Sequence, residues 1–212
     1  MRGGNTSKIQ RSHEQSQARS EERRSELAEF ALQTLAERGY ANTSLRDIAQ
    51  NSPYSHGVMS YYFSSKIDLI VYCLRRNWQI NIVKWADFFA GGPDPKTFPQ
   101  EVGRLTAASL RANPAFQVLW YDLRTQAVYE PDLRQAVEEI SESRLGLVRE
   151  GLELYAAARS AQPAWSAPTT LALLDGLVYN AALRHSAGDP EALDWLEREV
   201  ARFYELASLL PA

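Results

Sequence analysis

The sequence contains a single cysteine, Cys73, so no disulfide can form within its 212 residues. A chain without disulfides is typical of a reducing compartment. No apolar run reaches the roughly 18 residues that a membrane-spanning helix needs. Residues 1–25 are polar and lack the apolar segment of a secretory signal. These absences predict a soluble, cytoplasmic protein that has no contact with a membrane.

The usual signatures of an enzyme are also missing. The three histidines, His13, His56 and His185, are scattered, and none has a ligand partner at the spacing of a metal site. Cys73 lies in the middle of an expected helix with no histidine nearby, which is typical of an inert core residue. The sequence has no glycine-rich phosphate loop and no nucleophile elbow. We therefore expect no metal, no cofactor and no enzymatic activity.

No segment alternates apolar and polar residues as a strand does, so the fold class is predicted to be all-α. Glycine and proline separate about nine helical segments. We expect loops at 91–95 and 161–168, and an end to the first helix at Gly39. The expected helices are 19–38, 45–50, 56–62, 66–89, 97–112, 114–128, 131–159, 168–187 and 190–209.

The formal net charge of −3 does not by itself indicate nucleic-acid binding. Residues 1–24, however, hold six basic residues against three acidic ones. Residues 1–18 are therefore predicted to form a flexible arm before the first helix. Such an arm could lie along DNA phosphates, or it could be a solvated tail without a partner.

Two very short helices separated by the turn at 51–54 form a helix-turn-helix pattern. Ser44 with Asp47 three residues later resembles a capping box, and Ser55 is a plausible N-cap of the second short helix. The apolar or small residues Ile48, Ala49 and Met59 suit the place where the helices cross. The outer face of the second helix is polar and can enter the major groove of DNA.

The stretch Leu27–Leu69 resembles the DNA-binding domain of the TetR family of transcription regulators. The resemblance rests on ALQTLAERGY at 31–40, on TSLRDIA at 43–49 and on SHGVMSYYFSSKIDL at 55–69. Two positions depart from the family pattern, because Pro53-Tyr54 replaces the usual Gly-Val pair and Ser60 replaces the usual tyrosine. Proline cannot adopt a positive φ, so the turn is expected to have a different backbone.

This resemblance implies a set of DNA contacts on double-stranded operator DNA. His56, Gly57 and Val58 would contact base edges, and Ser55 belongs to the same outer face. Phosphate contacts would come from Ser44, Arg46, Ser60, Tyr61, Tyr62 and Lys66. For Tyr62 the alternative is a place in the core, and for Arg46 it is a solvated surface charge.

Three domains are expected: the arm at 1–18, a three-helix DNA-binding domain at 19–66, and a helical ligand-binding and dimerisation domain at 67–212. The last helix carries a narrow apolar seam at steps of three and four residues, formed by Leu193, Leu196, Val200, Phe203 and Ala207. The family resemblance implies that this seam forms a homodimer interface. The alternative is that the seam packs only within one subunit.

Aromatic residues are frequent in the middle helices, where they form either a core or the wall of a cavity. Because TetR-like proteins enclose a cavity, we expect an apolar, aromatic or multi-ring effector to bind there. The expected ligand-binding residues are Phe88, Phe116, Trp120, Leu123, Arg144, Asp175 and Val178. The predicted function is a repressor that leaves a palindromic operator when the effector binds. The alternatives are an activator, or an architectural DNA-binding protein without an effector.

Overall fold

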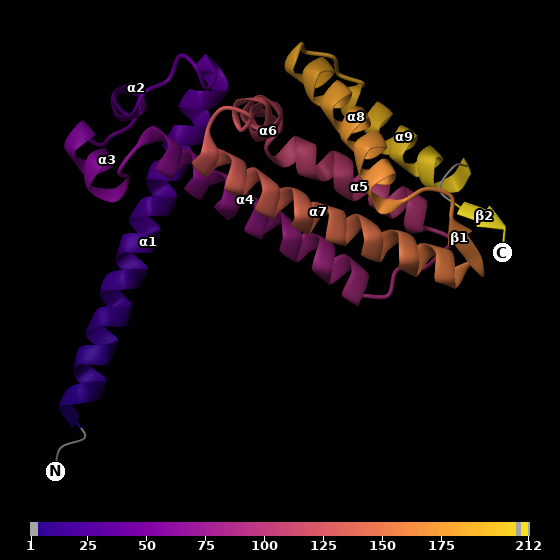
Figure 1. The fold of residues 1–212 in the computed structure, drawn as a ribbon, viewed down its shortest axis with the longest axis horizontal. Helices are drawn as coiled ribbons and strands as arrows, with labels where there is room; N and C mark the ends of the chain where they lie inside the picture. Colours follow the sequence, from indigo (N-terminus) through magenta and orange to yellow (C-terminus); the bar gives the residue numbers. More distant parts are fainter. Residues whose placement is uncertain (1–3, 207–208, 212) are drawn as a thin grey trace. The chain divides into compact units, whose positions relative to one another are not determined.

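The computed structural model describes the backbone of residues 4–206 and 209–211 and the side chains of residues 14–206. Nine α-helices and one antiparallel pair of three-residue strands make up this described part (Figure 1). The all-α expectation is confirmed, and the short strand pair is an addition to it. The elements are α1 Gly4–Arg38, α2 Leu45–Gln50, α3 His56–Tyr62, α4 Lys66–Ala90, α5 Phe98–Ala112, α6 Pro114–Gln126, α7 Pro131–Ala158, β1 Ala161–Pro163, α8 Ala167–Ser186, α9 Ala192–Leu206 and β2 Leu209–Pro211.

The chain forms two compact units, residues 1–73 and 74–212, whose boundary falls inside α4. None of the described helices is both long enough and apolar enough to cross a membrane. The last helix ends at Leu206, and residues 209–211 belong to β2 instead of extending the helix as expected. That strand pairs with β1 through main-chain hydrogen bonds, for which no alternation of side chains is required.

Helix α1 begins at Gly4, fifteen residues before the start that the apolar pattern indicated. The apolar periodicity begins near Leu27, so it could not locate the polar beginning of the helix. Residues 5–38 contain neither glycine nor proline, and most of them are compatible with helical structure. Residues 4–18 therefore continue the first helix instead of preceding it.

The N-terminal unit has its own core, in which Leu27 and Ala31 of α1 pack with Ile48, Met59 and Phe63. These five residues are almost fully buried. The short helices α2 and α3 thus bury their apolar sides against α1 and leave their polar sides exposed. This packing confirms the expected role of the small and apolar residues at the helix crossing.

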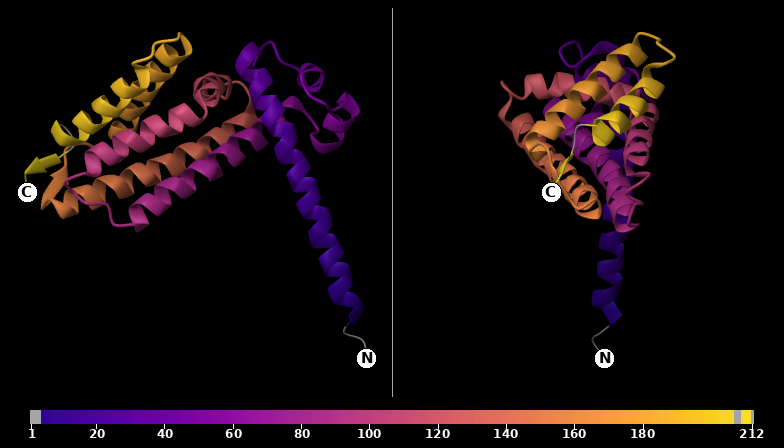
Figure 2. Two further views of the ribbon diagram at one scale, coloured as in Figure 1. Left: turned by 180° about the vertical axis from the view of Figure 1, so that it is seen from behind. Right: turned by 90° about the vertical axis from the view of Figure 1, so that its right-hand side faces the viewer.

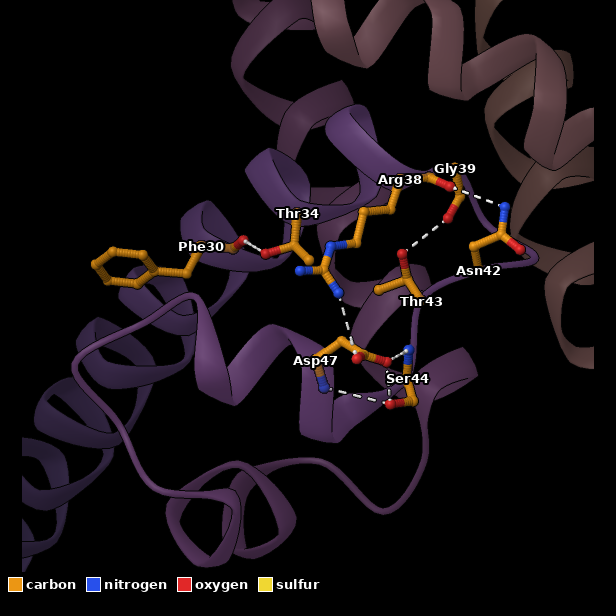
Figure 3. Close-up of polar contacts among 8 residues, drawn as sticks. All are labelled: Phe30, Thr34, Arg38, Gly39, Asn42, Thr43, Ser44 and Asp47. Atoms are coloured by element: carbon orange, nitrogen blue, oxygen red, sulfur yellow. Dashed lines mark hydrogen bonds and ion pairs between the residues drawn. The ribbon is translucent and has the colours of Figure 1, made fainter.

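The entry into α2 is fixed by local polar contacts (Figure 3). Gly39 ends α1 with a φ of +75°, a conformation that glycine adopts without steric cost. The capping box is confirmed: the Asp47 backbone N–H donates to Ser44 Oγ at 3.2 Å, and the Ser44 backbone N–H donates to Asp47 Oδ2 at 2.9 Å. Arg38 at the end of α1 donates to the same carboxylate at 3.3 Å.

In the C-terminal unit, α5 packs against α9, and α8 lies beside α9 (Figures 1 and 2). Gly103 of α5 permits the closest approach. A Cβ atom added there would lie 2.4 Å from the backbone oxygen of Glu197 in α9. Helix α4 is joined to α7 because Arg75 donates to Glu139 and Trp78 Nε1 donates to Ser143 Oγ at 3.0 Å.

We expect Gly103→Ala to destabilise the protein by about 1–3 kcal/mol, since α5 and α9 must separate to admit the methyl group. The control is Gly146→Ala in α7, where an added Cβ meets nothing within 4 Å. That change should raise stability by about 0.5–1 kcal/mol, because alanine favours the helix. Chemical denaturation of both variants measures the two free energies of unfolding. Equal effects at the two positions would contradict the assignment of Gly103 to a close helix contact.

A second prediction concerns pH. Hydrogen bonds from Ser44, with a further contribution from Arg38, hold the pKa of the Asp47 carboxyl below its usual range. A carboxyl whose pKa is lowered in the folded state stabilises that state above its ordinary pKa, and the benefit disappears as pH falls through the folded value. We expect Asp47→Asn to lower the Tm at neutral pH and the difference from the unaltered chain to shrink below about pH 4. Thermal unfolding across this range tests it, and a difference that stays constant with pH would refute it.

Candidate functional site

The outer face of α3 is open to solvent over its first turn. His56, Gly57 and Ser60 are exposed, Val58 is half-buried, and Met59 faces the core. Ser55 caps the helix by accepting the Val58 backbone N–H at 3.3 Å, as predicted. The residues predicted to contact base edges therefore lie together on one exposed helix end, and their contact with DNA stays a prediction.

The two tyrosines at the end of α3 differ in their surroundings. Tyr61 is 82% exposed, and its ring meets the edge of Tyr62 with centroids 5.0 Å apart. Tyr62 is half-buried and packs against the N-terminal core. Tyr61 is thus the better placed of the two to supply the phenolic hydroxyl that Ser60 lacks, and Tyr62 also has the core role considered from sequence.

The turn between α2 and α3 is attached to α1 by Tyr54. Its hydroxyl donates to Glu26 Oε2 at 2.8 Å and accepts from Arg23 Nη1 at 2.5 Å. The Tyr54 ring also meets the edge of Phe30 at 6.0 Å between centroids. Among the described non-glycine residues only Ser160 has a positive φ, so residues 51–54 all lie outside the left-handed region. This anchor on α1 was not predicted.

Three predicted phosphate contacts lie outside α3. Ser44 and Arg46 are exposed, although the Ser44 side chain also caps α2. Lys66 is half-buried: its Nζ donates to the Tyr40 carbonyl at 2.9 Å and lies 3.9 Å from the centroid of the Tyr40 ring. Lys66 therefore joins the start of α4 to the segment after α1, a structural role that sequence analysis missed.

The C-terminal unit contains a half-open cavity of about 160 Å³. Helices α4 to α8 contribute to its wall, and Tyr204 is added by α9. Large aromatic and aliphatic side chains dominate this wall. Among the residues that form it are Leu74, Trp78, Trp85, Phe89, Phe98, Val102, Phe116, Trp120, Ile140, Arg144, Leu147, Leu171, Leu174, Val178 and Tyr204.

The cavity contains four of the seven predicted ligand-binding residues, namely Phe116, Trp120, Arg144 and Val178. The other three predictions are corrected. Phe88 packs against the core cluster, Leu123 is fully buried, and Asp175 is ion-paired with Arg144, but none of the three forms part of the wall.

Of the residues in α4, only Phe88 was predicted to bind the ligand, and Phe88 is not in the wall. The wall residues of this helix are Leu74, Asn77, Trp78, Asn81, Trp85 and Phe89, and the steps of four that join Leu74, Trp78, Asn77, Asn81, Trp85 and Phe89 along one face were the available signal.

Behind the wall lies a group of charged and phenolic side chains that we call the Asp175 cluster, formed by Tyr121, Arg124, Arg144 and Asp175. Arg124 Nη1 donates to Asp175 Oδ2 at 2.8 Å, and Arg144 donates to both carboxylate oxygens. The Tyr121 hydroxyl donates to the Asp175 backbone carbonyl at 3.1 Å. Burial, reinforced by the Asp175 charge, raises the pKa of Tyr121, so its hydroxyl stays protonated at neutral pH. The cluster joins α6, α7 and α8.

Trp120 connects the cluster to the cavity. Its ring forms part of the cavity wall, with the guanidinium carbons of Arg144 and Arg124 at 5.6 Å and 5.9 Å from the ring. The indole Nε1–H is buried and has no acceptor within the described part of the chain. The side chain itself is only 4% exposed. Trp120 and Arg144 thus belong to the cavity wall, and Arg124, which is not part of the wall, lies near the same ring.

The predicted dimer seam on α9 requires a correction. Leu193, Leu196 and Val200 are buried within the subunit, in the core that α9 shares with α5 and α8. Phe203 packs partly against the same core, and Ala207 lies outside the described residues. The steps of three and four reflect packing within one subunit, because a single apolar stripe on a helix can satisfy only one neighbouring surface.

Exposed apolar residues occur instead on α8. Leu173, Tyr179 and Leu183 are each roughly two-fifths exposed. Gly176, between them, has open space around the position of a Cβ atom. This α8 face, defined by Leu173, Gly176, Tyr179 and Leu183, is therefore an apolar surface without a covering element in the described chain.

Comparison with known proteins matches both units. Residues 28–73 match the family model described as "Bacterial regulatory proteins, tetR family", and residues 102–205 match "BetI-type transcriptional repressor, C-terminal". The chain is 27% identical over 174 residues to the HTH-type transcriptional regulator BetI of Burkholderia mallei, covering 79% of this chain and 84% of that protein.

Solved structures share the fold. A TetR transcription regulator from Haloarcula marismortui has a TM-score of 0.71 at 18% identity, covering 90% of this chain and 100% of that one. A putative transcriptional regulator from Saccharomonospora viridis, in complex with choline, has a TM-score of 0.66 at 20% identity, covering 90% and 99%. FadR from Bacillus subtilis, in complex with stearoyl-CoA, has a TM-score of 0.70 at 16% identity, covering 84% and 95%.

These relatives are regulators and not enzymes, and the helix-turn-helix geometry of α2 and α3 agrees with the two family matches. The chain therefore belongs to the TetR family of DNA-binding, ligand-responsive transcription regulators.

Proposed function

We propose that this regulator is a homodimeric repressor that binds a palindromic operator and leaves it when a small effector occupies the cavity. The observation that carries the proposal is the exposed polar end of α3, held by a helix-turn-helix core in a chain that also contains an apolar cavity. The family model that matches residues 102–205 is described as that of a transcriptional repressor, which supports repression over activation.

On the operator, α3 enters the major groove with its N-terminal end leading. His56 donates to a guanine O6 or N7, and Val58 packs on a thymine methyl group. Arg46 and Tyr61 contact the phosphates on either side, since both side chains extend into solvent. Lys66 opens α4, and the N-terminal end of this helix is a further place for a phosphate contact.

Two subunits associate through the α8 face. Leu173 and Leu183 lie ten residues apart, nearly three helical turns, so they can pair along the length of a second copy of α8. The missing side chain of Gly176 allows the two helices to approach closely there. A twofold dimer presents two identical copies of α3, which is why the operator is expected to be palindromic.

The effect of the ligand on DNA binding is transmitted through α4, which contributes residues to both units. Its first turns bury Leu69 and Cys73 in the N-terminal core, and its later turns supply Trp78, Trp85 and Phe89 to the cavity wall. An effector that displaces these later turns changes the position of the DNA-binding unit. By linkage, the effector binds the DNA-free form more tightly, and DNA weakens effector binding by the same factor.

The effector is mainly apolar, because aromatic and aliphatic side chains dominate the wall. A cavity of about 160 Å³ is close in size to cavities that hold benzene, of roughly 150 Å³. Of the apolar, aromatic or multi-ring effectors expected from sequence, a molecule with one ring or a short chain matches this volume. The choline and stearoyl-CoA in two related structures show how widely effectors differ among proteins of this fold.

We expect His56→Ala to change which base is preferred at one position of each half-site, at a cost of about 1–3 kcal/mol on the best operator. Arg46→Ala should weaken binding to all sequences alike and reduce the salt dependence by about one unit of slope per lost contact in each subunit. The measurements are sequencing of selected bound DNA and binding titrations at several salt concentrations. Arg149→Ala, at an exposed position on α7, serves as the control with unchanged binding. If His56→Ala and Arg46→Ala weaken every sequence equally, His56 does not read bases.

We expect Leu173→Glu with Leu183→Glu to give a monomer, because charged side chains on the α8 face would lose their hydration in a dimer. Operator affinity should then fall about 100-fold or more, because the two DNA-binding units of the dimer bind the two half-sites together, whereas monomers bind each half-site separately. Sedimentation and operator titration measure these outcomes. The matched control is Leu154→Glu on α7, which is equally exposed but lies outside the proposed interface. A monomeric unaltered chain, or a variant that remains dimeric, would exclude this interface.

A further inference from the structure

The polar groups of the cavity wall include no carboxylate. Among the described residues that form the wall, Arg144 is the sole side chain with a full charge, and the other polar groups are neutral amides and hydroxyls. A wall with a guanidinium and no carboxylate repels a cationic ligand and attracts an anionic one. The charge of the effector is therefore constrained by this chain's own residues.

The Asp175 cluster has more positive than negative charge. Arg124 and Arg144 share the single carboxylate of Asp175, which leaves one positive charge uncompensated among these three residues. Asp175 and Arg144 are largely buried, with 12% and 20% of their side-chain surfaces exposed. Arg124 is 39% exposed, so part of the excess charge is solvated. Arg144 belongs to the cavity wall, where its charge has little contact with water and a ligand anion would stabilise it.

Two donors are positioned for such an anion. The buried Trp120 Nε1–H lacks an acceptor within the described residues, a rare state for a buried donor that indicates where a ligand acceptor binds. Arg144 donates two hydrogen bonds to Asp175. A guanidinium has five N–H groups, so it can donate to a ligand as well. Both side chains belong to the cavity wall, and the Arg144 guanidinium carbon lies 5.6 Å from the centroid of the Trp120 ring. A carboxylate beside Arg144 would accept from its guanidinium, and it would accept from Trp120 Nε1 once the ligand displaces the side chains that cover this buried atom.

We propose that the effector is a small organic monocarboxylate, whose carboxylate accepts hydrogen bonds from Trp120 Nε1 and from the Arg144 guanidinium. Its apolar part, about one ring or a short acyl chain, lies among the aromatic side chains of the wall, including Phe116. This inference rests on the effector cavity of the proposed function and adds the charge class of the ligand. It assigns Trp120 and Arg144 as the residues that determine this specificity.

The test uses three probes that share one ring and differ in charge: phenylacetate, phenylacetamide and benzyltrimethylammonium. Calorimetric titration of the full-length protein gives a Kd for each. We expect phenylacetate to bind roughly 10- to 100-fold more tightly than phenylacetamide, because hydrogen bonds to charged groups are the stronger ones. Benzyltrimethylammonium should bind more weakly than either. Equal affinity for the acid and the amide, tighter binding of the cation, or no binding of any probe at millimolar concentration overturns the proposal.

Two variants locate the contact. Arg144→Gln should remove the preference for the acid by weakening phenylacetate roughly 10- to 100-fold, with little change for phenylacetamide. Trp120→Phe retains the ring and loses the N–H, so it should weaken the acid and the amide by similar factors of about 5 to 10. The matched control is Arg149→Gln on α7, which removes an exposed charge outside the cavity. Circular dichroism confirms that each variant is folded.

Operator titration with and without phenylacetate separates this inference from the proposed function. An acid preference that depends on Arg144, combined with unchanged operator affinity, supports the carboxylate site and refutes the coupling to DNA. A preference that survives in Arg144→Gln, or that disappears equally in Arg149→Gln, overturns the assignment of the site itself.

Discussion

The continuity of α4 is the constraint on which the rest of this molecule depends. One helix, Lys66–Ala90, contributes to two separate cores. Leu69 and Cys73 are buried among the helices of the N-terminal unit, while Phe89 is buried in the C-terminal core and also borders the cavity. Both cores therefore depend on side chains of this one helix, and the proposed control of DNA binding by the cavity rests on that shared helix.

The N-terminal unit shows how a domain of this size keeps its recognition helix in place. Helices α2 and α3 have six and seven residues, too few to be stable alone. They depend on the capping contacts at Ser44 and Ser55, on burial against α1, and on two long-range anchors. Tyr54 attaches the turn to α1, and Lys66 attaches the start of α4 to Tyr40. These anchors hold the turn against α1 and the start of α4 against the segment that follows α1.

In the C-terminal unit, apolar packing forms the core, and polar contacts join the helices beside the cavity. The α5–α9 contact, tight enough to require Gly103, encloses the core and leaves α8 with an apolar outer face. The Asp175 cluster then joins α6, α7 and α8 at the end of the cavity that Trp120 borders. Through its ion pair with Asp175, Arg144 is therefore joined to α8, the helix with the exposed apolar face.

The sequence alone determined those features that depend on neighbours within a few residues. The all-α class, most helix ends, the caps at Ser44 and Ser55 and the helix-turn-helix are set by local periodicity, by glycine and proline, and by residues three positions apart. The family resemblance follows from the same local spacing, and it led to the cavity and to Trp120, Phe116 and Arg144 in its wall.

The tertiary structure decided which of several equivalent surfaces faces which partner. A stripe at steps of three and four on α9 shows that one side is apolar, but not whether α5 or a second subunit covers it, and the fold buries it against α5. Likewise, nothing near Tyr54, Lys66 or Asp175 in the chain names Glu26, Tyr40 or Arg144 as a partner. The two residues of each pair lie 26 or more positions apart in the sequence. Their distance in space depends on how all the helices pack, and the spacing of neighbouring residues carries no information about that packing.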